Sequence, residues 1–93
     1  MADDASSMPT AADWVARAAR IAAIAAAEAD EIERRRALTP AVLKIIDETK
    51  IVRLLMPRHM GGGEQDFVAL NDVVSVVAAG DASTAWCLAQ ALT

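Results

Sequence analysis

A chain of 93 residues is long enough for one small domain with a modest core. Its residues are 55% hydrophobic but only 3% aromatic, and an apolar content made mostly of alanine, valine, isoleucine and leucine favours an all-α fold. The formal net charge of -4 argues against partners such as nucleic acid or an anionic membrane surface.

The single cysteine, Cys87, cannot form an internal disulfide, which fits a reducing compartment. We expect it to be a small, buried apolar residue. No apolar run approaches the roughly 20 residues that a membrane span needs. Acidic residues stand where a signal peptide would be basic, at Asp3, Asp4 and Asp13. The sequence therefore predicts a cytoplasmic protein that does not bind a membrane.

The first predicted element is a long amphipathic helix that follows a small, polar and flexible lead-in at residues 1–9. Thr10 is the expected N-cap, and Asp13 stands three residues later as in a capping box. The helix is expected to end near Arg36. The apolar residues of its buried stripe are Trp14, Ala18, Ile21, Ala25 and Ile32.

A run of three arginines, Arg34 to Arg36, closes this helix and follows several glutamates. Glu31 reaches Arg35 at a spacing of four residues, which is typical of an ion pair on a solvated helix end. Cationic side chains near a helix C-terminus also interact favourably with the helix dipole. Phosphate binding by these arginines is the alternative interpretation.

A second helix is predicted from Thr39, its N-cap, to about Lys50. Pro40 suits the first helical position because it has no N–H to leave unsatisfied there. Residues 51–57 are then expected to be extended or to form a short turn, since Pro57 disfavours helical backbone at the residue before it. The apolar stripe of this second helix consists of Val42, Ile45, Ile46 and Thr49.

A third helix is predicted after the glycine loop at residues 61–63, from Phe67 to about Ala79. Asp66 is its expected N-cap and Gly80 its stop. Several β-branched valines in this segment would also suit a strand. The spacing of the apolar positions favours the helix instead, and these positions are Leu70, Val73, Val74 and Val77.

The fourth predicted helix begins after Asp81, its N-cap, with Thr84 at the third helical position. It is apolar nearly all round, which predicts a central and buried helix. No stop signal precedes Thr93, so residues 10–93 are interpreted as one helical domain that is truncated within its fourth helix.

No motif in the chain completes a catalytic site. The glycines at 61–63 do not form the spacing of a dinucleotide-binding loop, and no lysine of a phosphate-binding loop follows them, so we interpret them as a tight turn. His59 has no second histidine or cysteine at metal-ligand spacing, and nothing marks a nucleophile for it to activate. We predict a surface loop histidine and no metal site.

Trp86 and Ser83, both on the fourth helix, are the candidate binding residues. A tryptophan among alanines most often fills a core, but it can also form the wall of a flat pocket for a planar ligand. Ser83 can offer its hydroxyl to such a ligand, although a serine near a helix start more commonly bonds backbone.

The segment Pro57-Arg58-His59-Met60-Gly61-Gly62 resembles the proline-to-Gly-Gly turn of the acyl-CoA dehydrogenase superfamily. In that superfamily the turn follows two N-terminal helices and precedes a helix that opens with an acidic residue. The same order here spans about residues 14 to 93. The resemblance implies the N-terminal helical segment, of about four helices, of an acyl-CoA dehydrogenase-like fold.

Two further segments resemble the oxygenase components of two-component flavin monooxygenases of the 4-hydroxyphenylacetate hydroxylase type. They are residues 33–36 with Leu38 and Thr39, and residues 81–86. The resemblance implies hydroxylation of an aromatic or polycyclic small molecule with O2 and reduced flavin, FMN or FAD, delivered by a separate reductase. It also implies that Trp86 and Ser83 lie near the flavin or substrate pocket.

The resemblance leaves out much of the family's fold. The β-barrel domain that covers the flavin, and the C-terminal helical bundle that builds a homotetramer, have no counterpart in this sequence. We therefore expect no catalytic residue here and no activity from these 93 residues alone. Two alternatives stay open, namely an acyl-CoA dehydrogenase that oxidises a thioester with FAD, and a non-catalytic helical interaction module.

Overall fold

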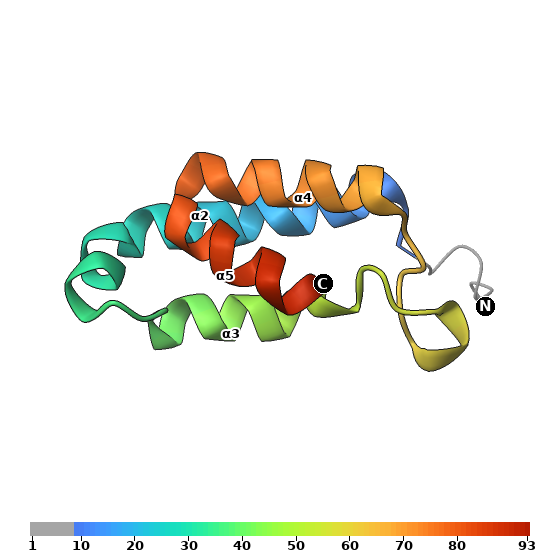
Figure 1. Cartoon of the computed structure of the whole chain (residues 1–93), viewed down its shortest axis with the longest axis horizontal. Coiled ribbons are helices and arrows are strands. Elements are labelled where there is room, and N and C mark those ends of the chain that lie inside the picture. The colour runs from blue at the N-terminus through green and yellow to red at the C-terminus, as the bar shows by residue number, and fades with distance from the viewer. Residues whose placement is uncertain (1–8) are drawn as a thin grey trace, which may run out of the picture.

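The computed structural model describes residues 9–93, and these residues form helices and no strand. The all-α prediction is therefore confirmed for this part of the chain. Figure 1 shows the helices lying roughly side by side in a body 46 × 26 × 20 Å in extent. Within residues 9–93, no helix is both long enough and apolar enough to cross a bilayer. The helices are α2 (Ala11–Arg35), α3 (Pro40–Thr49), α4 (Phe67–Gly80) and α5 (Ala82–Leu92), with two 3-10 turns, η1 (Ile51–Arg53) and η2 (Arg58–Met60).

Each helix begins at the N-cap that the sequence predicts. A side-chain oxygen of the cap accepts a hydrogen bond from a backbone N–H that the first helical turn would otherwise leave free. Thr10 and Asp13 bond each other's backbone N–H at 2.8 and 3.1 Å, which completes the capping box. The other three caps are Thr39, which accepts from Val42 at 3.4 Å, Asp66, which accepts from Ala69 at 3.0 Å, and Asp81, which accepts from Thr84 at 2.8 Å.

The capping box makes the start of α2 sensitive to acid. The Thr10 backbone N–H, and next the Thr10 hydroxyl, hold the pKa of Asp13 below its ordinary value. A depressed folded-state pKa means that the stabilisation is present above the unfolded pKa and is lost as pH falls through the folded one. Thermal unfolding from about pH 7 to about pH 2.5 should therefore show an Asp13→Asn variant less stable at neutral pH, with the gap closing in acid. A pH-independent gap between the Asp13→Asn variant and the parent would contradict this role of the capping box.

Two helices end in residues with left-handed backbone. Arg36 has φ 53° after α2, and Lys50 has φ 56° after α3. Glycine is favoured at such positions because a side chain is strained there. A Lys50→Gly variant should therefore gain about 0.5–1 kcal/mol of unfolding free energy in urea titrations. Lys44→Gly, within α3, should lose about 1 kcal/mol instead, and equal effects at the two sites would contradict the assignment.

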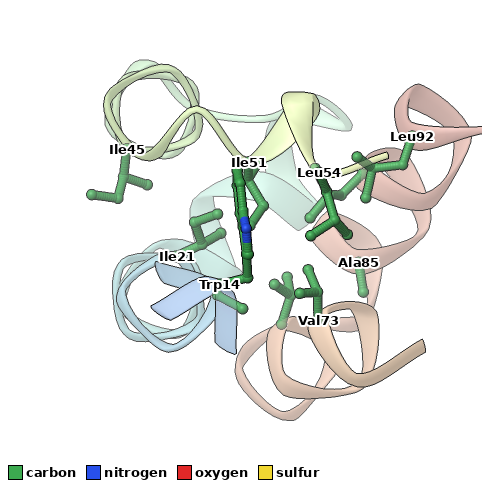
Figure 2. Close-up of a cluster of buried hydrophobic side chains, with 11 residues drawn as sticks. Trp14, Ile21, Ile45, Ile51, Leu54, Val73, Ala85 and Leu92 are labelled. Atoms are coloured by element: carbon green, nitrogen blue, oxygen red, sulfur yellow. The ribbon is translucent and has the colours of Figure 1, made fainter. Parts of the chain in front are cut away.

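The core lies where α2 packs against α4 and α3, with η1 and α5 closing the remaining side. The predicted stripe of α2 is confirmed, since Trp14, Ala18, Ile21, Ala25 and Ile32 are all at most 3% exposed. Figure 2 shows the main cluster of buried hydrophobic side chains, with the Trp14 ring near its middle. Ile21, Ile51, Leu54 and Val73 lie around this ring. A smaller cluster, formed by Ala25, Ile32 and Val42, holds the far end of α2 to α3.

Two expectations about the later segments need adjustment. Residues 51–57 follow the short-turn alternative, because η1 buries Ile51 and the next residue, Leu54, fully within the core. The prediction of a central, buried α5 is wrong. Only one side of α5 is buried, through Thr84, Ala85, Leu88 and Leu92, while the opposite side is open to solvent.

Candidate functional site

An open hollow of about 530 Å³ lies between the end of α2, the connection to α3 and the first turns of α5. In Figure 1 this is the end of the molecule where α5 begins beside the α2–α3 connection. Its volume falls within the range of about 300–1,000 Å³ typical of small-molecule pockets. The lining residues are Ile32, Glu33, Arg36, Ala37, Leu38, Ala82, Ser83, Trp86 and Cys87.

Trp86 and Ser83, the two residues that the sequence selects, both line this hollow. Trp86 is 68% exposed, so the more common interpretation of it as a core residue is wrong. The reason is its register on α5. It lies two residues beyond the buried Thr84, which at 3.6 residues per turn places it on the far side of the helix. Its ring is therefore available as a broad apolar wall.

The hydroxyl of Ser83 has no hydrogen-bond partner among residues 9–93. The backbone bond that the more common interpretation predicts is absent there, because Asp81 and Thr84 cap α5 between them. The Asp81 carboxylate accepts from the Thr84 N–H at 2.8 Å and from its hydroxyl at 2.7 Å. Ser83 thus presents an uncommitted donor and acceptor beside Trp86.

Cys87 is exposed and lines the same hollow, so the prediction of a buried cysteine is wrong. Like Trp86, it lies on the side of α5 that faces away from the core. Cys87 is exposed although it is apolar, because α5 has more apolar residues than its single buried face can accommodate.

The rim of the hollow carries one acidic and one basic residue, Glu33 and Arg36. Among residues 9–93 the ion pairs near this end join Glu31 to Arg34 and, at 4.0 Å, to Arg35. These pairs confirm the prediction of a solvated helix end. They also leave the Arg36 guanidinium and the Glu33 carboxylate outside any ion pair within the described residues.

The glycine loop lies at the opposite end of the molecule (Figure 1) and is a tight turn, as predicted. Gly61 has φ 82°, and His59 beside it is exposed. This loop cannot surround a phosphate with backbone donors, because its three glycine N–H groups are already bonded internally. They donate to Arg58 O at 3.0 Å, Pro57 O at 3.0 Å and Arg53 O at 2.8 Å.

The residues that line the hollow suit the binding of a ligand. Among residues 9–93, no group of histidine, cysteine, aspartate and glutamate is placed to hold a metal ion. His59 is not among the lining residues, and η2, which contains it, lies at the other end of the body from the start of α5 (Figure 1). The arrangement can bind a flat, mostly apolar molecule, with polar groups of Ser83 and Arg36 at its edge.

Sequence reasoning does not identify Ile32, Leu38 and Arg36 as lining residues of one hollow with α5. Ile32 belongs to the core stripe and Leu38 precedes the Thr39 cap, so both read as structural. For Arg36 and Leu38, though not for Ile32, the segments on which the resemblance rests could have served as a signal. Those segments, residues 33–36 with Leu38 and Thr39, and residues 81–86, are distant in sequence, and each contributes residues to the lining of the hollow.

Comparisons of the chain with protein-family models, with curated proteins and with solved structures found no match.

Proposed function

We propose that this chain serves as the N-terminal helical part of a flavin-dependent monooxygenase, which hydroxylates an aromatic or polycyclic small molecule. One observation supports the proposal above others. The two segments that resemble flavin monooxygenase oxygenase components contribute Glu33, Arg36 and Leu38 from one side of a single hollow, and Ala82, Ser83 and Trp86 from the other.

The residues of the hollow suit one wall of a pocket for a planar ligand. The Trp86 indole offers a stacking surface, and aromatic pairs gain about 0.5–1.5 kcal/mol beyond area burial. The Ser83 hydroxyl can bond a polar group on the ring edge, and the Arg36 guanidinium can pair with an anionic substituent. Ile32 and Leu38 exclude water from the apolar side.

Reduced flavin, when bound, would supply the oxygen chemistry that side chains cannot perform. This chain's part is to hold and orient a ring. The remaining walls, the reductase partner and a homotetrameric assembly belong to the proposal and depend on protein outside these residues.

The proposal is tested on the protein encoded by the reading frame that contains this chain, together with a flavin reductase. With reduced FMN or FAD and O2, we expect a hydroxylated aromatic product and a transient flavin absorbance that differs from the reduced and oxidised forms. Reduction of bound FAD by an acyl-CoA, without hydroxylation, would instead support the acyl-CoA dehydrogenase alternative. A reading frame that ends at Thr93 and yields no flavin binding would support the non-catalytic module.

Two variants test whether the ligand binds at the hollow. Trp86→Ala should raise the dissociation constant for flavin or substrate by about tenfold, the equivalent of one lost stacking contact. Leu43→Ala removes a 52% exposed apolar side chain from α3, away from the hollow, and should leave binding unchanged. Equal effects of the two variants would show that Trp86 is not a pocket wall.

A further inference from the structure

Of the four helices within residues 9–93, α5 alone carries no charged side chain. The chain has 13 acidic and 9 basic residues and a net charge of -4, so two copies repel each other overall. The exposed side of α5 places none of that charge in a contact between copies. Interface cores are likewise depleted of charge and enriched in aromatic residues such as tryptophan. The exposed residues of α5 are Ala82, Ser83, Trp86, Cys87, Gln90 and Ala91.

The same surface holds a protruding ring and a hollow that can receive one. Trp86 is 68% exposed, and it lines the hollow of about 530 Å³ between the start of α5 and the end of α2. Volumes of this order hold drug-sized ligands, so a single indole ring fits. A two-fold interface uses the same patch on both copies, so a ring and a hollow on one patch allow each copy to insert its ring into the other.

The rim of the hollow is complementary in charge to a second copy of itself. Glu33 and Arg36 both line the hollow, and neither takes part in an ion pair within residues 9–93. In a two-fold interface, contact of Arg36 with Glu33 of a second copy implies the reciprocal contact of Glu33 with Arg36 of that copy. An acidic partner would instead repel Glu33, and a basic one would repel Arg36. Charge therefore favours a second copy over either.

We propose that the hollow and the exposed side of α5 form a self-association surface, on which a second copy docks about a two-fold axis, with Trp86 entering its hollow and Arg36 facing its Glu33. The two exposed indoles supply roughly 200–350 Å² of buried surface. The other residues that line the two hollows add to this area. The interface stays below about 1,200 Å², as in transient complexes, and the dissociation constant is on the order of 100 µM. The dimer covers the hollow that the proposed function assigns to a flavin, but its formation does not rest on that function.

Sedimentation equilibrium of the 93-residue chain without flavin, between about 10 µM and about 1 mM, tests the association. We expect a monomer–dimer equilibrium whose dissociation constant rises about tenfold or more in Trp86→Ser, because the ring that fills the other copy's hollow is lost. Phe67→Ser removes a 73% exposed apolar side chain from the start of α4 and should have no effect. A chain that stays monomeric throughout, or equal weakening by the two variants, overturns the proposal.

Cys87 reports the same contact without a substitution. Its thiol is exposed and lines the hollow, so the dimer should cover it. Alkylation by iodoacetamide should be about threefold slower at about 1 mM protein than at about 10 µM. The Trp86→Ser variant should lose this difference and Phe67→Ser should keep it. A rate constant that does not depend on protein concentration overturns the proposal.

Exchanging the rim charges separates this docking from general repulsion between copies. Glu33→Lys and Arg36→Glu should each weaken the dimer, because each sets like charges against one another at the rim. In an equimolar mixture of the two variants, every rim contact again joins opposite charges. At low salt the mixed dimer should therefore be severalfold tighter than either variant alone. Net charge by itself predicts a mixed dimer of intermediate affinity, since Glu33→Lys reduces the excess of acidic residues and Arg36→Glu increases it. That intermediate result overturns the proposal.

Discussion

Replacing Trp14 by alanine is expected to lower the unfolding free energy by about 3–5 kcal/mol, the range for deleting a buried aromatic side chain. Trp14 is 2% exposed and stands at the centre of the main core cluster (Figure 2). The glycine loop at residues 61–63 also packs closely against the Trp14 ring, since a Cβ added to Gly63 would lie 2.5 Å from the Trp14 Cζ2 atom. Domains of this kind have about 5–15 kcal/mol of stability in total, so the variant should be marginally folded.

The chain provides its own control for this experiment. Trp86→Ala removes the same side chain from a site that is 68% exposed and should cost less than about 0.5 kcal/mol. Urea titrations followed by far-UV circular dichroism measure both variants. Comparable losses for the two tryptophans would contradict the burial assigned to them.

A conservative substitution refines the same prediction. The Trp14 Nε1 atom is buried without a hydrogen-bond partner among residues 9–93. Arg17 covers the ring face at 4.6 Å and also donates to Thr49 O at 3.0 Å. Trp14→Phe loses no hydrogen bond and keeps a ring for Arg17, so it should recover more than half of the stability that alanine loses.

The second large effect is expected at Gly80, where α4 crosses α2. A Cβ built there would lie 2.8 Å from the Ala22 carbonyl carbon and would also meet its oxygen. These are backbone atoms, which cannot move aside as the end of a flexible side chain can. Overpacking of this kind costs about 1–3 kcal/mol, and the loss should occur in the largest helix–helix contact of the fold.

The sign of the Gly80→Ala effect decides between two physical arguments. Helix propensity alone would make alanine stabilising by up to about 1 kcal/mol at a helical position. The close approach to Ala22 predicts a lower melting temperature instead. Ser75→Ala, at an exposed site on the same helix, should stay within about 0.5 kcal/mol of the parent. A higher melting temperature for Gly80→Ala would contradict the α2–α4 packing.

Local sequence signals predict the helices well because their causes are local. A cap residue such as Thr39 or Asp66 satisfies N–H groups two or three residues away, and Gly61 takes the positive φ that its turn requires. The buried stripe of α2 is also predictable, since the charged residues of this helix lie off the stripe and mark the solvent side.

The orientation of α5 cannot be predicted in the same way. Its residues are apolar nearly all round, so no polar stripe marks the face that meets solvent, and only packing against α4 and η1 decides which side is buried. The burial of Trp86 and Cys87 is mispredicted for this reason. The selection of Trp86 and Ser83 as candidates rests on resemblance, and their role in flavin binding stays a prediction.

The hollow as a whole was beyond sequence reasoning because it depends on a long-range contact. Ile32 to Leu38 and Ala82 to Cys87 are separated by more than forty residues, and no periodicity relates them. Both segments line one hollow, because α5 follows directly on α4, the helix that packs most extensively on α2.

A flavin titration followed by 1H–15N NMR tests the role of Trp86 most directly. The chain has two indole N–H signals, and the buried Trp14 serves as an internal reference for the exposed Trp86. With millimolar FMN, saturable shifts should appear at the Trp86 indole and the Ser83 amide, while the Trp14 indole stays in place. Trp86→Phe should weaken these shifts at Ser83. An unmoved Trp86 signal, or shifts confined to α3 and the glycine loop, would contradict the proposal that this hollow is a flavin-facing wall.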